Sequence, residues 1–137
     1  MQKFEYPVKI LMLWGEAISG NEEACKWLIA NGFKELGLFV YALRNHDKPR
    51  EWLLLNGYPH LMALINGVEG KVDAIEWLLK QGFPLLAKVA AAADGDSESV
   101  KWLLSNDKLF AMLAAKIKKV KDQIDLDNSW YYKISSE

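Results

Sequence analysis

The chain has few of the residues that reactive and metal-binding sites need. Its 137 residues include one cysteine, Cys25, and two histidines, His46 and His60. A single cysteine cannot form an internal disulfide bond, so a reducing compartment is expected. Neither histidine has a second histidine or a cysteine at the spacing of a metal site. The residues therefore predict no metal, no cofactor and no catalytic activity.

Long apolar runs and an excess of one charge are also missing. The first apolar run, from Ile10 to Trp14, is five residues long, which is too short for a signal-peptide core or a membrane span. The 17 basic and 18 acidic side chains leave a net charge of −1. That balance provides no global attraction to nucleic acid or to an acidic membrane. We therefore expect a soluble, cytoplasmic protein.

What the chain has instead is an internal repeat of 25 residues. Each copy carries a tryptophan followed by two aliphatic residues, and a glycine follows five positions after the tryptophan in three of the four copies. Self-similarity at a fixed period is the signature of a repeat architecture. The copies span about 8–32, 33–57, 58–82 and 83–107. Their tryptophans are Trp27, Trp52, Trp77 and Trp102.

Each copy predicts two short helices. In the second copy, Leu36, Phe39, Val40 and Leu43 follow the spacing of one helical face. Helices of about ten residues are marginal alone in water, and a two-helix unit cannot bury both of its faces, so neighbouring units must stack. The prediction is an all-α solenoid of about four helix-turn-helix units, a short rod or arc. Because leucines flank the tryptophans, we expect the tryptophans to be core residues.

The pattern changes after Lys108 to one longer helix. Leu113, Ile117, Val120 and Ile124 occupy one face of this helix. We expect it to cap the last repeat, so that residues 1–137 form a single domain with a C-terminal cap over 108–137. The lysines of the helix lie off the apolar face, at Lys116, Lys118, Lys119 and Lys121.

Three segments of the repeat resemble the second half of an ankyrin repeat. They read GNEEACKWLIANG over 20–32, GKVDAIEWLLKQG over 70–82 and GDSESVKWLL over 95–104. FPLL at Phe83–Leu86 and YPHL at Tyr58–Leu61 are similar to the Thr-Pro-Leu-His sequence that opens an ankyrin unit. An ankyrin unit has about 33 residues and carries a β-hairpin finger, for which a 25-residue unit has no room. The resemblance, over about 8–106, implies recognition of protein partners through the first helices.

The predicted binding surface lies on the first of the two helices in each copy, along the side that does not carry the core residues. It mixes tyrosine, methionine and arginine, types that are enriched at interfaces, and solenoids usually bind partners on their concave face. We therefore predict a non-catalytic protein-interaction module or adaptor. The alternative is a binder of nucleic acid or an acidic partner through the four lysines, although no aromatic residue interleaves them. The predicted protein-binding residues are Tyr41, Arg44, Met62, Asn66 and Ala91.

Overall fold

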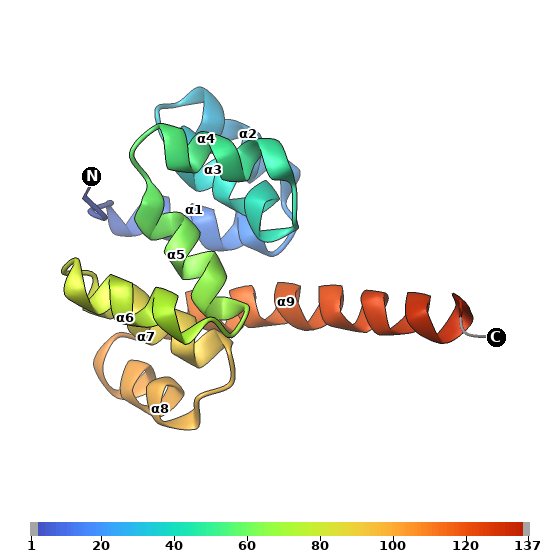
Figure 1. Cartoon of the computed structure of the whole chain (residues 1–137). Helices are drawn as coiled ribbons and strands as arrows, with labels where there is room; N and C mark the ends of the chain where they lie inside the picture. Colours follow the sequence, from blue (N-terminus) through green and yellow to red (C-terminus); the bar gives the residue numbers. More distant parts are fainter. Residues whose placement is uncertain (1–2, 136–137) are drawn as a thin grey trace.

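The predicted all-α fold is confirmed by a computed structural model that describes residues 3–135, with side chains described as far as residue 128. The described residues form nine α-helices and no β-strand (Figure 1). Positions 136 and 137 of the predicted cap lie outside the described residues. The helices are α1 (Val8–Ile18), α2 (Glu22–Ala30), α3 (Lys34–Leu43), α4 (Asp47–Leu55), α5 (Pro59–Val68), α6 (Val72–Lys80), α7 (Pro84–Ala93), α8 (Ser97–Asn106) and α9 (Lys108–Ser135).

The helices α1–α8 form four pairs, and their boundaries follow the 25-residue period. We call α1, α3, α5 and α7 the first helices, and α2, α4, α6 and α8 the second helices. Each turn within a pair places one residue at positive φ, a glycine in three pairs and Asn45, at φ 70°, in the remaining pair. Asparagine tolerates this left-handed conformation better than other side chains. The turns therefore end the first helices at the same position of every copy.

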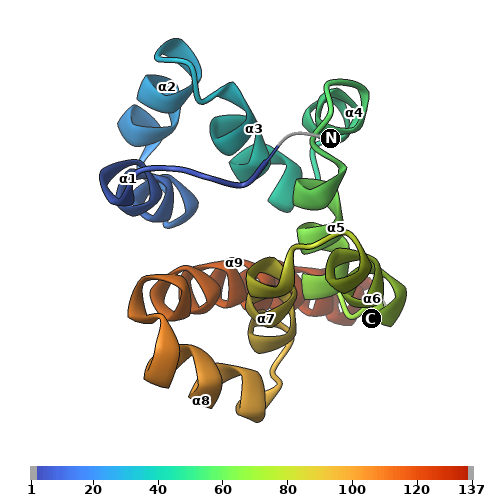
Figure 2. The ribbon, with the colours of Figure 1, turned by 90° about the vertical axis from the view of Figure 1, so that its left-hand side faces the viewer.

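Helix α9 packs against both ends of the array. It contacts α7 and α8, as expected of a cap, and it also contacts α1 and α5. Gly15 makes the approach to α1 possible, because an added Cβ there would lie 3.3 Å from the side chain of Leu113. In Figure 2, α9 lies between α1 and α8. The expected open rod is therefore closed on one side by α9, which covers apolar surface of α1, α5 and α7.

One position is buried in all four second helices, and it is the leucine that follows each tryptophan. Leu28, Leu53, Leu78 and Leu103 are all 0% exposed. By contrast, Trp27 is 45% and Trp102 42% exposed, and Trp52 and Trp77 are only partly buried. The tryptophans are therefore not the most deeply buried residues of the second helices: Trp52 and Trp77 pack against the core, as expected, and Trp27 and Trp102 are more exposed than expected. One residue along a helix is a rotation of about 100°, so when the leucine points inward the tryptophan lies at the edge of its helix.

His60, in the first turn of α5, is buried without a polar partner. Its ring stacks on Phe83, with centroids 4.6 Å apart and planes 2° apart, and it is fully shielded from solvent. Neither ring nitrogen has a hydrogen-bond partner among the described residues. Burial disfavours the charged imidazolium and lowers the pKa of His60 to about 4.

We expect the stability of the fold to decrease as the pH falls from about 6.5 to 4. In the unfolded chain the imidazole titrates near pH 6.5, so in this interval the unfolded state binds the proton and is favoured by it. The loss approaches about 3 kcal/mol near pH 4, at about 1.36 kcal/mol for each pKa unit. Urea unfolding of the wild type and of His60→Leu, between pH 7 and pH 4, measures this term.

Leucine is a suitable replacement because Leu85 stands at the same position of the next copy. The carboxylates titrate in both proteins, so their effect cancels in the difference. Identical acid dependence of the two proteins would show that His60 is not the source.

Candidate protein-binding grooves

Two open grooves lie between the second helices. The middle groove is bounded by Leu54 of α4 and Trp77 of α6, has α5 as its floor and has a volume of about 630 Å³. The last groove is bounded by Leu79 of α6 and Trp102 of α8, has α7 as its floor and has a volume of about 540 Å³. Figure 2 shows α4, α6 and α8 spread apart around α5 and α7. Each groove is thus a gap between two second helices, closed below by a first helix.

The two grooves use equivalent positions of the repeat. The leucine on one wall is Leu54 or Leu79, which are 56% and 55% exposed. The other wall is formed by the tryptophan of the following copy. Because only one of the two aliphatic residues after each tryptophan can face the core, the other is left on the surface. The pairs of floor residues related by one repeat are Pro59 and Pro84, Met62 and Ala87, Ala63 and Lys88, and Asn66 and Ala91.

The equivalent space between α2 and α4 is occupied by larger side chains of the chain itself. Gly37 on α3 lets Ile29 approach so closely that an added Cβ would lie 2.5 Å from its Cγ1. Leu38 and Tyr41 stand where the middle groove has an alanine and an asparagine. The ammonium group of Lys34 lies 5.1 Å from the ring centroid of Trp52. The approach of Ile29 to Gly37, together with the larger side chains of Leu38 and Tyr41, therefore distinguishes this first space from the middle groove.

Three of the predicted binding residues line the grooves. Met62 and Asn66 belong to the floor of the middle groove, and Ala91 to the floor of the last groove. Tyr41 instead lies in the first space, 5.8 Å from the ring of His46. Arg44 donates a hydrogen bond from Nη2 to the carbonyl oxygen of Ile18, at 3.2 Å.

The sequence prediction missed the walls of the grooves. Trp77 and Trp102 were assigned to the core, and Leu54 and Leu79 were not separated from the buried leucines beside them. The pair of aliphatic residues after each tryptophan could have indicated an exposed wall residue, because two successive helix positions cannot both point inward.

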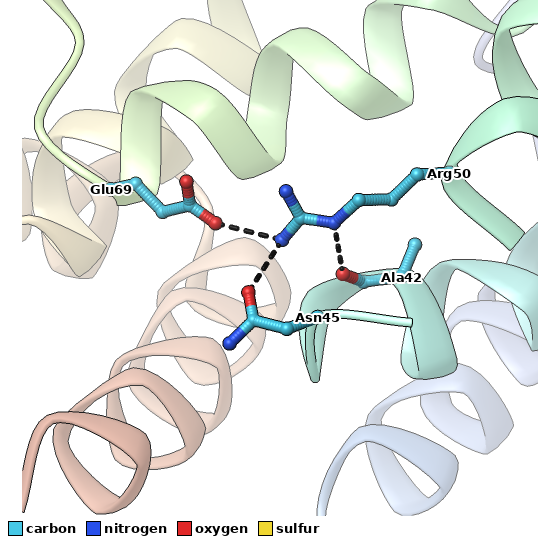
Figure 3. A network of polar contacts seen from close by, with 4 residues as sticks. All are labelled: Ala42, Asn45, Arg50 and Glu69. Carbon is cyan, nitrogen blue, oxygen red and sulfur yellow. Dashed lines mark hydrogen bonds and ion pairs between the residues drawn. The ribbon is translucent and has the colours of Figure 1, made fainter. Parts of the chain in front are cut away.

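A polar network fixes α4 to the floor of the middle groove (Figure 3). Arg50 of α4 donates from Nε to the carbonyl oxygen of Ala42, at 2.9 Å, and from Nη2 to Oδ1 of Asn45, also at 2.9 Å. The same Nη2 lies 2.8 Å from Oε1 of Glu69, which follows α5. Arg50 replaces an apolar residue of the repeat, and its guanidinium pairs with the carboxylate of Glu69. The network joins the helix that carries Leu54 to the helix that forms the floor.

Three of the four lysines in the predicted basic patch contact groups of the chain itself. Lys116 donates to Oγ of Ser19, at 2.9 Å, and Lys121 pairs with Asp94, at 2.7 Å. Both partners follow the last residue of a first helix, where a cation is favoured by the helix dipole. Lys118 pairs with Asp122 of the same helix, and Lys119 is exposed. Two of the four charges thus hold α9 against the array.

The remaining reactive side chain, Cys25, is also engaged in the interior. Its Sγ donates to the carbonyl oxygen of Gly37, at 3.3 Å, and burial raises the pKa of its thiol. In the part of the chain that the structure describes, no group of three or more histidine, cysteine, aspartate or glutamate side chains is placed to hold a metal ion. No helix formed by these residues is both long and apolar enough to cross a membrane.

Comparison with known proteins adds no further assignment. No protein-family model matches the chain, and no curated protein or solved structure matches it. The ankyrin-like character therefore stays a prediction from the sequence.

Proposed function

We propose that this chain is a non-catalytic protein-interaction module that binds a segment of a partner protein in the middle and last grooves. The observation that carries the proposal is the repetition of exposed apolar walls at equivalent positions of the two grooves. Leu54, Leu79 and Leu104 occupy one repeat position and are each more than half exposed. Large contiguous apolar surfaces on soluble proteins are commonly interaction sites. In architecture we propose an ankyrin-like solenoid without fingers.

The grooves have the chemistry of an interface centre. Each groove has a tryptophan and a leucine on its walls and one first helix as its floor. Aromatic side chains in pockets often contribute most of the binding energy at interfaces. Because the second helices pack on the first helices beside them, the walls are held apart before a partner arrives. A preformed groove reduces the ordering cost of binding.

The second candidate function is binding of nucleic acid or an acidic partner by the lysines of α9. Lys119, which is exposed, is the observation in its favour. The intramolecular contacts of Lys116 and Lys121 weigh against it, because a phosphate would have to compete with Ser19 and Asp94.

We expect the double variant Leu54→Lys, Leu79→Lys to weaken binding of a partner segment by more than tenfold. A lysine on each wall would place an ammonium group in the apolar groove, where its desolvation opposes binding. The probe is the peptide most enriched from a phage-displayed random library on the immobilised full chain, and fluorescence polarisation measures its affinity.

The matched control is the double variant Lys118→Glu, Lys119→Glu, which should change the affinity by less than about twofold at 150 mM salt. Tyr41→Ala is a second control, because Tyr41 lies outside both grooves. If the α9 variant abolished binding and the groove variant did not, the lysine alternative would replace the proposal. A steep loss of affinity with salt would point the same way.

A further inference from the structure

Trp52 and Trp102, in the copies before and after that of Trp77, are each covered by a lysine of the chain itself. The ammonium group of Lys34 lies 5.1 Å from the ring centroid of Trp52, at the first space. The ammonium group of Lys88 lies 5.6 Å from the ring centroid of Trp102, at the last groove. Both distances fall within the range of a cation–π contact, in which a positive charge is attracted to the face of an aromatic ring.

The middle groove has the tryptophan but not the lysines. The position of Lys34, one repeat later, is Pro59, and the position of Lys88, one repeat earlier, is Ala63. Both of these residues line the middle groove together with Trp77. Among the residues that the structure describes, no cation lies over Trp77. The middle groove is thus the one of the two open grooves in which the tryptophan face is left for another molecule.

We infer that Trp77 receives a lysine or arginine side chain from the partner segment, an inference that rests on the proposed function. The repeat itself supports this chemistry, because the chain places a cation on the equivalent ring on both sides. The occupant is therefore a peptide segment in which a basic residue enters the middle groove. An apolar residue of the same segment enters the last groove, where Lys88 already supplies the cation.

The other groups of the middle groove suit a basic side chain. Asp73 lies one turn before Trp77 on α6 and lines the same groove, so its carboxylate can attract the cation. Asn66 adds an amide oxygen from the floor, and Met62 and Leu54 offer apolar surface to the aliphatic stem. The opposing charge is Lys71, at the N-cap of α6. Asp73 stands between Lys71 and Trp77 along the helix, so the cation is placed at the Trp77 end.

The test is a double-mutant cycle between Trp77 and the basic residue of the peptide. The probe is the peptide enriched on the full chain, together with the same peptide in which its lysine or arginine is replaced by methionine, which keeps an aliphatic stem without the charge. We expect the enriched peptides to contain a basic residue and the methionine peptide to bind the wild type about 3- to 30-fold more weakly. In Trp77→Leu this difference should largely disappear.

Trp27→Leu is the matched control, because Trp27 occupies the same repeat position but has no preceding second helix and borders no groove of this kind. It should leave the full difference between the two peptides. A second variant, Ala63→Lys, puts a lysine one repeat before Lys88, where its ammonium group can lie over the ring of Trp77. It should weaken the peptide with the basic residue by about tenfold and leave the methionine peptide nearly unchanged.

The outcomes separate this inference from the proposed function. Peptides whose binding depends on Leu54 and Leu79, but not on a basic residue or on Trp77, would overturn the inference and leave the groove as the binding site. Unchanged binding to Ala63→Lys would overturn it as well. Enriched peptides that are insensitive to every groove variant, or no enriched peptide at all, would overturn both.

Discussion

Truncation of the chain after Asn106 should abolish cooperative unfolding, because it removes α9. Four large side chains of α9 are buried against the array, and burial of one such side chain contributes about 1.5–3 kcal/mol. Their sum is comparable to the whole stability of a typical domain, about 5–15 kcal/mol. The truncation also exposes the surfaces of α1 and α7 that α9 covers. The four side chains are Phe110, Leu113, Ile117 and Val120.

Circular dichroism during heating measures this effect. The control is a chain that ends after Asn128, which keeps these four buried side chains and should melt close to the wild-type temperature. If the chain that ends at Asn106 melted cooperatively with a midpoint close to the wild type, α9 would be an accessory cap and not part of the core. The contact between Gly15 and Leu113 would then have no role in stability.

The second large effect is expected at the buried leucines. Leu103→Ala should lower the free energy of unfolding by about 2–5 kcal/mol, the range for a leucine in a close-packed core. Trp102→Ala should cost less than this, because truncation of a residue that is 42% exposed opens a surface site to water and leaves no closed cavity in the core. Urea unfolding of the two variants measures both values.

The expectation that all four tryptophans are core residues would instead give a loss of about 3–5 kcal/mol on truncation of Trp52 or Trp77 to alanine. Those two rings are partly buried, so their truncation should fall between Trp102→Ala and Leu103→Ala. A greater loss for Trp102→Ala than for Leu103→Ala would return the tryptophans to the core.

The helices and turns could be predicted because their signals are local. The i, i+3, i+4 pattern of Leu36, Phe39 and Val40 predicts α3, and the glycine or asparagine that ends each first helix stands 25 residues from the next. Four copies of the same pattern reinforce one another, so a weak signal in one copy is supported by the other three. The floor residues Met62, Asn66 and Ala91 were found in the same way.

Two features could not be predicted: which side of each second helix faces the core, and which helices far apart in the sequence are in contact. The approach of α9 to α1 joins residues almost 100 positions apart, as the contact between Lys116 and Ser19 shows, and periodicity within a helix carries no information about such a pair. The exposure of Trp27 and Trp102 was not predicted, because flanking leucines do not show which of several neighbouring apolar positions points inward. The leucine beside each tryptophan fits the inward position, and the larger ring lies at the edge.

The position of α9 also decides which surface is left for a partner. The sequence predicted binding on an open concave face of the first helices, but α9 covers apolar surface of three of them. The gaps between the second helices remain open, and residues of α5 and α7 reach solvent through them. Three of the residues predicted on the first helices, Met62, Asn66 and Ala91, therefore lie in the floors of grooves whose walls are formed by the second helices.

Mapping of amide chemical shifts shows whether a partner segment binds between the second helices. The full chain, labelled with ¹⁵N, is titrated with the peptide enriched on it. We predict the largest shift changes at residues that line the middle and last grooves, around Asn66, Trp77 and Ala91, with little change along α9. The largest changes at Lys118 and Lys119, with no change at the groove residues, would place the binding site on α9 instead.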